Sequence, residues 1–90
     1  MTYKTIEEMI LELAKRFKKI RKMKKITQYT LSKTSNIPLA TIKHFESKGE
    51  ISLHKLTALC VSLDIDYEIQ NMFTEIQFKN IDEVIRYGKA

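Results

Sequence analysis

Apolar residues recur at helical spacing through most of the 90-residue chain and divide it into a series of amphipathic helices. The first helix is expected to start after Thr5, where Glu7 and Glu8 suit a helix N-terminus, and to run for about five turns. Its inward face is expected to consist of six apolar residues: Ile6, Met9, Ile10, Leu13, Phe17 and Ile20.

Two short helices are expected next, close together in the sequence. One covers residues 28–34, with Thr27 as its N-cap and Leu31 as its inward residue. The other covers residues 38–47 and ends before Gly49, and its inward residues are Ile42 and Phe45.

The four residues between these helices, Ser35-Asn36-Ile37-Pro38, predict a sharp turn. Asn36 is the non-glycine residue type that best tolerates a positive φ, and Pro38 suits the first turn of the helix that follows. Residues 27–47 are therefore predicted to form a helix-turn-helix.

A fourth helix is expected after Ser52, which suits an N-cap, and residues 64–66 are expected to close it. Its inward residues are predicted to be Leu53, Leu56, Leu59, Cys60 and Leu63.

The tail over residues 67–90 has a weaker pattern. It is compatible with a short fifth helix, with a short strand at Ile76-Gln77-Phe78 and with a last helix after Asn80. Its many apolar side chains must be shielded from water, either by the core of the same chain, by a second copy in a dimer or by another protein.

The helix-turn-helix segment resembles the DNA-binding unit of Xre/Cro/C1-type repressors over residues 13–65. The residues that carry this resemblance are TQ-x-x-L-S from Thr27, Ile37 after the turn, T-I-K-H-F-E from Thr41, and Arg21 in the preceding helix. The resemblance implies an all-α, lambda-repressor-like bundle of about five helices, with a DNA-binding domain over residues 1–66 and a tail over 67–90.

Two residues depart from the family pattern. Asn36 replaces the usual turn glycine, and it is a tolerable substitute. Pro38 replaces the usual Ser or Thr N-cap and offers no side-chain oxygen, so this helix start is expected to be less well capped.

The helix over residues 38–47 is the expected recognition helix. Lys43 and His44 are its polar candidates for reading base edges, although either could instead contact only the DNA backbone. Gln28 is expected to meet a phosphate, as its family counterpart does, or else to be an ordinary surface residue. The complete set of predicted DNA-binding residues is Gln28, Leu39, Ala40, Thr41, Lys43, His44, Ser47 and Lys48.

The acidic residue of the motif, Glu46, has no nucleophile or paired acid beside it in the sequence. The resemblance implies that it pairs with Arg21 and ties the recognition helix to the first helix. Removing one partner of such a partly buried pair is expected to destabilise the protein more than the pair stabilises it net.

The net charge of +5 is unevenly distributed along the chain. Residues 1–49 carry +8 and residues 50–90 carry −3, and eight of the eleven residues over 15–25 are basic. This basic run indicates either a nucleic-acid surface, a solvated helix face or a helix that lies on a membrane. The neighbouring helix-turn-helix favours nucleic acid, because the folded motif uses the apolar face that a membrane helix would need.

Several classes of protein are not expected. No apolar stretch approaches the roughly 20 residues that span a membrane, and Glu7, Glu8 and Glu12 argue against a signal peptide, so a cytoplasmic protein is expected. Cys60 is expected to be a buried, reduced thiol. No metal, cofactor or enzyme active site is predicted, because no set of residues has zinc-ligand or catalytic spacing.

Two functions follow from the resemblance. The first is a repressor that binds double-stranded DNA at a palindromic operator as a homodimer, with recognition helices about 34 Å apart. The second is an antitoxin whose tail binds a toxin protein and which represses its own operon. The pattern F-K-x-I-D-E-V-I from Phe78 in the tail is similar to that of HipB-like antitoxins.

Overall fold

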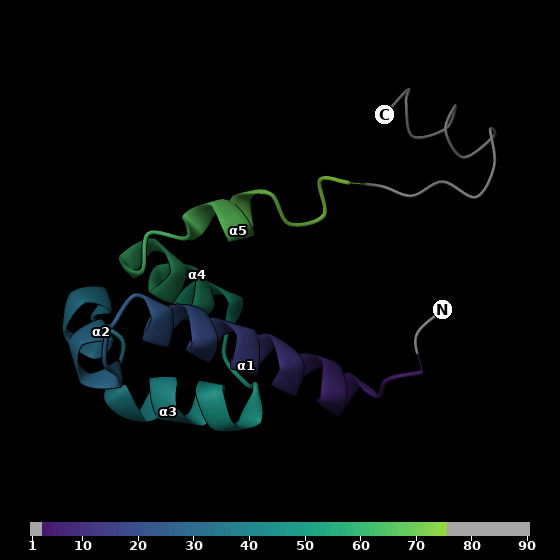
Figure 1. Ribbon diagram of the computed structural model, residues 1–90, viewed down its shortest axis with the longest axis horizontal. Helices are drawn as coiled ribbons and strands as arrows, with labels where there is room; N and C mark the ends of the chain where they lie inside the picture. Colours follow the sequence, from purple (N-terminus) through teal and green to yellow (C-terminus); the bar gives the residue numbers. More distant parts are fainter. Residues whose placement is uncertain (1–2, 76–90) are drawn as a thin grey trace.

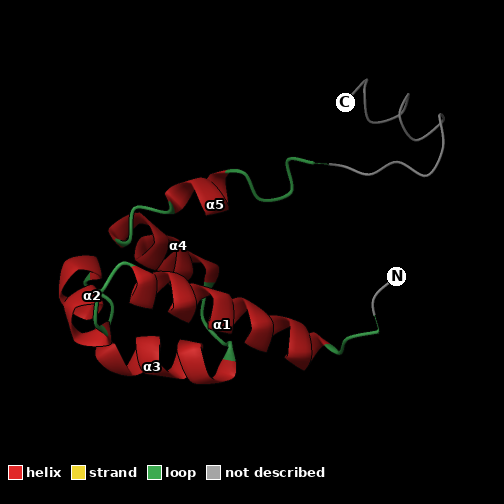
Figure 2. Ribbon diagram, viewed as in Figure 1, coloured by secondary structure: helices red, strands yellow, loops and turns green. Residues whose placement is uncertain are grey.

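The computed structural model describes residues 3–75, which form five helices and no strand (Figures 1 and 2). The helices are α1 (Ile6–Met23), α2 (Gln28–Ser35), α3 (Leu39–Lys48), α4 (Leu53–Ser62) and α5 (Asp66–Gln70). The predicted all-α bundle of about five helices is therefore confirmed. The predicted strand at residues 76–78 and the last helix after residue 80 lie outside the described residues.

Helix α1 begins with a reciprocal capping box. The Thr5 side chain accepts a hydrogen bond from the Glu8 backbone N–H, and the Glu8 carboxylate accepts one from the Thr5 N–H. These bonds satisfy two of the backbone donors that a helix start leaves unpaired, and Glu7 and Glu8 also suit the positive end of the helix dipole. The expected start and length of the first helix are confirmed.

The inward face of α1 was predicted only partly correctly. Phe17 is buried as expected and Ala14 joins it, but Ile6, Met9 and Leu13 are 71%, 44% and 44% exposed. In Figure 1 the start of α1 extends beyond the end of α3, so its first turn has no neighbouring element in the described part of the chain. Leu13 lies further along and lines a hollow together with Leu56 and Ile69, which leaves it partly open to solvent. Helical periodicity identifies which residues share a face, but not how far the packing partner reaches.

The turn between α2 and α3 has the predicted conformation. Thr27 caps α2 by accepting a hydrogen bond from the Thr30 N–H, and Asn36 ends the helix in the left-handed region at φ 62°. The Ser32 hydroxyl donates to the Ile37 carbonyl at 2.6 Å, which closes the turn. Pro38 precedes α3 without any side-chain capping bond, as its lack of a side-chain oxygen predicts.

The core lies where α1, α2, α3 and α4 meet. The rings of Phe17 and Phe45 pack edge to face, with centroids 5.2 Å apart, and they join α1 to α3, which lie side by side (Figure 1). Leu31, Ile42 and Leu59 are fully buried around them. These residues are the inward residues that the sequence predicts for α2, α3 and α4.

Gly49 fixes the end of α3 against α1. Its backbone is left-handed at φ 79°, and a Cβ atom at this position would lie 2.8 Å from the Ile10 carbonyl oxygen. Glycine is required here for both reasons, because any other residue would be strained and would also push the two helices apart.

Helices α4 and α5 close the other side of the core. Ser52 caps α4 as predicted, by accepting a hydrogen bond from the Lys55 N–H. Leu53 was predicted to point inward, but it is 66% exposed because it lies in the first turn of α4, at the edge of the apolar face. Helix α5 spans the predicted boundary between residues 66 and 67, and its Ile69 packs against the core.

Candidate nucleic-acid interface

Helix α3 presents a polar face to solvent because its opposite face is fixed in the core. Ile42, Phe45 and Glu46 are buried. Among the predicted DNA-binding residues of this helix, Leu39 and Thr41 are half-buried, and the other five are exposed: Ala40, Lys43, His44, Ser47 and Lys48. The structure therefore brings these five onto the accessible side of one ten-residue helix.

The size and chemistry of this face suit the major groove of duplex DNA. A ten-residue helix is about 15 Å long, and an α-helix fits a groove about 12 Å wide. Lys43 can donate to guanine O6 and N7, and Ser47 can donate to or accept from a base edge. Ala40 has no polar group, so its contribution would be an apolar contact with a thymine methyl group.

The recognition helix is tied to α1 by a buried ion pair. Arg21 Nε lies 2.7 Å from Glu46 Oε2 and Arg21 Nη2 lies 2.9 Å from Glu46 Oε1, so the pair is bidentate. The remaining Arg21 nitrogen, Nη1, donates to the Ile26 carbonyl at 2.8 Å in the loop before α2. The guanidinium thus joins α1, the loop and α3 in one geometry, with its charge neutralised by the carboxylate.

Gln28, at the start of α2, takes part in the same network. Its amide nitrogen donates to Glu46 Oε1 at 2.9 Å. This bond holds the side chain at the junction between α2 and α3, which leaves its carbonyl oxygen, its second amide hydrogen and its backbone N–H for other partners. The Gln28–Glu46 contact could not be predicted from the sequence, because a separation of 18 residues does not indicate that the two side chains meet.

His44 has a neighbour that the sequence pattern does not indicate. Its Nε2 atom lies 2.9 Å from Glu50 Oε1, and both side chains are largely exposed. The contact places a carboxylate beside a predicted base-reading residue, where it would face the negative charge of DNA. Gly49 makes this possible, because its left-handed backbone turns the chain back at the end of α3.

Residues 3–75 contain little that suggests a metal site, a reactive thiol or a membrane-spanning helix. No group of three or more His, Cys, Asp or Glu residues in this range could hold a metal ion. Cys60 is buried, and burial, together with the nearby Glu68 and Asp66 carboxylates, raises the pKa of its thiol to about 11. The same range contains no helix with the length and apolar character that crossing a membrane requires.

Comparison with known proteins agrees with this geometry. A family model described as helix-turn-helix matches residues 17–70, which is more than half of the chain. The match runs from the middle of α1 to the end of α5 and includes the α2–turn–α3 unit, the Arg21–Glu46 pair and the exposed face of α3. No curated protein matches the chain.

Proposed function

Because the chain belongs to the Xre/Cro/C1-type helix-turn-helix family and is a DNA-binding transcriptional regulator, we propose that it is a repressor that binds a palindromic operator as a homodimer. The observation that carries this proposal is the exposed polar face of α3, held in a fixed orientation by the bidentate Arg21–Glu46 pair. Such a face can enter the major groove without rearrangement of the protein.

In the proposed complex, α3 lies in the major groove and α2 crosses the DNA backbone. Lys43 and Ser47 contact base edges, and the exposed imidazole of His44 contacts a base or a phosphate. The N-terminus of α2 offers the Gln28 backbone N–H to a phosphate, a contact that the helix dipole favours. Occupancy of such a site within a promoter would block transcription.

Support for a dimer comes from apolar side chains that the bundle leaves uncovered. Ile6, Met9 and Leu13 are exposed on α1, and Met72 and Phe73 are exposed after α5. One recognition helix reads only a few base pairs, so a second copy would supply both cover for these side chains and a second half-site about 34 Å away.

The proposal can be tested by selecting binding sequences from a randomised duplex library with the full chain. We expect an enriched inverted repeat whose half-site centres are about ten base pairs apart. The Lys43→Ala variant is the matched control, because it removes one exposed reader without changing the buried face of α3. If the parent enriches no sequence, or if Lys43→Ala enriches the same sequence with equal strength, the proposed reading mode is wrong.

Sedimentation of the full chain at micromolar concentration tests the dimer separately. A dimer is the expected result. A monomer that enriches a single half-site would overturn the dimer and favour the alternative function, in which a toxin protein covers the apolar surface and the DNA binding regulates a shared operon.

A further inference from the structure

We propose that three lysines of α1, Lys15, Lys18 and Lys22, form a second DNA contact that binds phosphates of one strand beside the groove that α3 reads. We call these residues the α1 lysine strip. The inference rests on the proposed function, because it assumes that the chain binds duplex DNA. It adds a part of the footprint that lies outside the helix-turn-helix itself.

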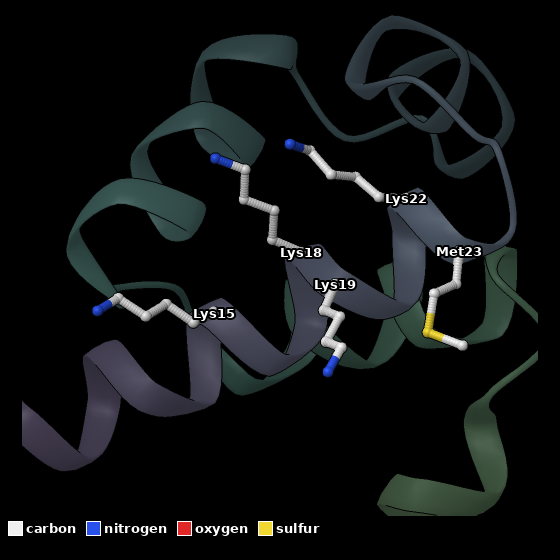
Figure 3. A pocket seen from close by; sticks show the side chains of 5 residues that line it. All are labelled: Lys15, Lys18, Lys19, Lys22 and Met23. Carbon is white, nitrogen blue, oxygen red and sulfur yellow. The ribbon is translucent and has the colours of Figure 1, made fainter.

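The geometry of α1 brings the three side chains together. They occupy positions i, i+3 and i+7, so they share one face of the helix, and all three are exposed. Figure 3 shows their ammonium groups extending toward α3, whereas Lys19 extends to the other side of the same shallow hollow. The strip is about 10 Å long, since each residue adds 1.5 Å along the helix axis.

The fold separates this strip from the rest of the basic run. Arg21, in the middle of the run, is buried and neutralised by Glu46. Lys18 and Lys22, by contrast, have no carboxylate within 4 Å among residues 3–75. Their charges therefore serve no internal ion pair and remain available to an anion outside the protein.

Duplex DNA fits this strip better than other polyanionic surfaces do. The lysines lie on the side of α1 that is next to α3, so a duplex that receives α3 in its groove brings a sugar-phosphate backbone close to them (Figure 3). Phosphates of one strand succeed each other by about 3.4 Å along the duplex axis, so a strip of about 10 Å spans at least three of them. A flat membrane would meet the strip together with the exposed face of α3, and four of the five exposed residues named on that face are polar.

The test compares two double variants that remove equal charge from the same helix. Lys18→Gln/Lys22→Gln changes the strip, and Arg16→Gln/Lys19→Gln is the matched control on other faces of α1. Binding is measured by fluorescence anisotropy from 50 to 200 mM salt, with the selected duplex and with a scrambled duplex of the same length. Circular dichroism melting verifies that both variants fold.

Each lost phosphate contact lowers the slope of log affinity against log salt by about 0.9. We therefore expect the strip variant to lose about 1.8 from the slope, which makes its affinity loss between 50 and 200 mM salt about tenfold smaller than that of the parent. The change should be equal on both duplexes, because phosphates carry no sequence information. The control variant should keep most of the parent slope, and Lys18→Arg/Lys22→Arg should restore it.

Equal slopes for the strip and control variants would overturn the inference while leaving the proposed function intact. A parent chain without salt-dependent duplex binding would instead defeat the proposed function itself. A third outcome, in which the strip variant binds DNA normally but loses binding to vesicles of anionic phospholipid, would assign these lysines to a membrane surface and would also overturn the inference.

Discussion

Replacing Glu46 with alanine should lower stability and DNA affinity together. The substitution removes both acceptors of the Arg21 guanidinium, at 2.7 and 2.9 Å, and the acceptor of the Gln28 amide, at 2.9 Å. Arg21 is only 6% exposed, so its charge is left in the interior, and among residues 3–75 the Ile26 carbonyl is its one remaining partner. The recognition helix also loses its polar attachment to α1.

The magnitude follows from the burial of the pair. Removing one partner of a buried ion pair costs about 3–5 kcal/mol, because the other charge stays desolvated and uncompensated. A small domain has a total unfolding free energy of roughly 5–15 kcal/mol, so the loss is a large fraction of the whole. An exposed carboxylate supplies the matched control: Glu50→Ala should change stability by no more than about 0.5 kcal/mol.

A double-mutant cycle with urea unfolding measures the coupling. Arg21→Ala and Glu46→Ala should each destabilise the protein, and the double variant should be less destabilised than the sum of the two, by about 2–3 kcal/mol. Glu46→Gln keeps the shape and one acceptor oxygen, so it provides a milder variant if Glu46→Ala does not fold. Single-variant energies that simply add, or an unchanged unfolding midpoint for Glu46→Ala, would refute the role of the pair.

Three further predictions concern the exposed Glu50, the left-handed Gly49 and the buried Cys60. Glu50→Gln should raise DNA affinity about three- to fivefold at low salt, because it removes a carboxylate beside His44. Repulsion between that carboxylate and one phosphate amounts to roughly 1 kcal/mol. An affinity that falls or stays constant in anisotropy titrations would mean that Glu50 does not face DNA. Gly49→Ala should lower the unfolding free energy by about 1–3 kcal/mol because of its φ of 79°, and an unchanged urea midpoint would contradict the tight contact with α1. Cys60 should resist alkylation at pH 8 in the folded protein and react rapidly in denaturant. The pKa of the folded thiol, about 11, lies above its ordinary value of 9.0, so the folded state keeps the proton to a higher pH than the unfolded state does. Stability should therefore be unaffected below about pH 9 and should fall as the pH rises toward 11. Rapid labelling of the native thiol would refute its burial.

Local signals in the sequence were sufficient to predict most of the helices and several of their ends. Thr5, Thr27 and Ser52 cap helices where their side chains predict it, and Asn36 and Gly49 adopt the positive φ that their residue types favour. Capping and turn conformations depend on neighbours within a few residues, so a sequence pattern contains the information they need.

Contacts between helices were less predictable. Ile6 and Leu53 have apolar side chains at helical spacing but are exposed, because burial depends on where the neighbouring helix ends. The Gln28–Glu46 and His44–Glu50 contacts were also missed, since they depend on how α2 and the chain after α3 approach the recognition helix. In the basic run, the sequence indicates an anion-binding surface, whereas only the fold separates the lysines beside α3 from the buried Arg21.

The proposed function depends most directly on which face of the protein meets DNA. Titration of the isotope-labelled chain with duplex DNA, followed by amide chemical-shift changes in NMR spectra, measures that face residue by residue. We expect the largest changes at Gln28 and along α3, from Leu39 to Lys48, with small changes in α4 and α5. Largest changes in α4 and α5, with α3 unaffected, would contradict the proposed function.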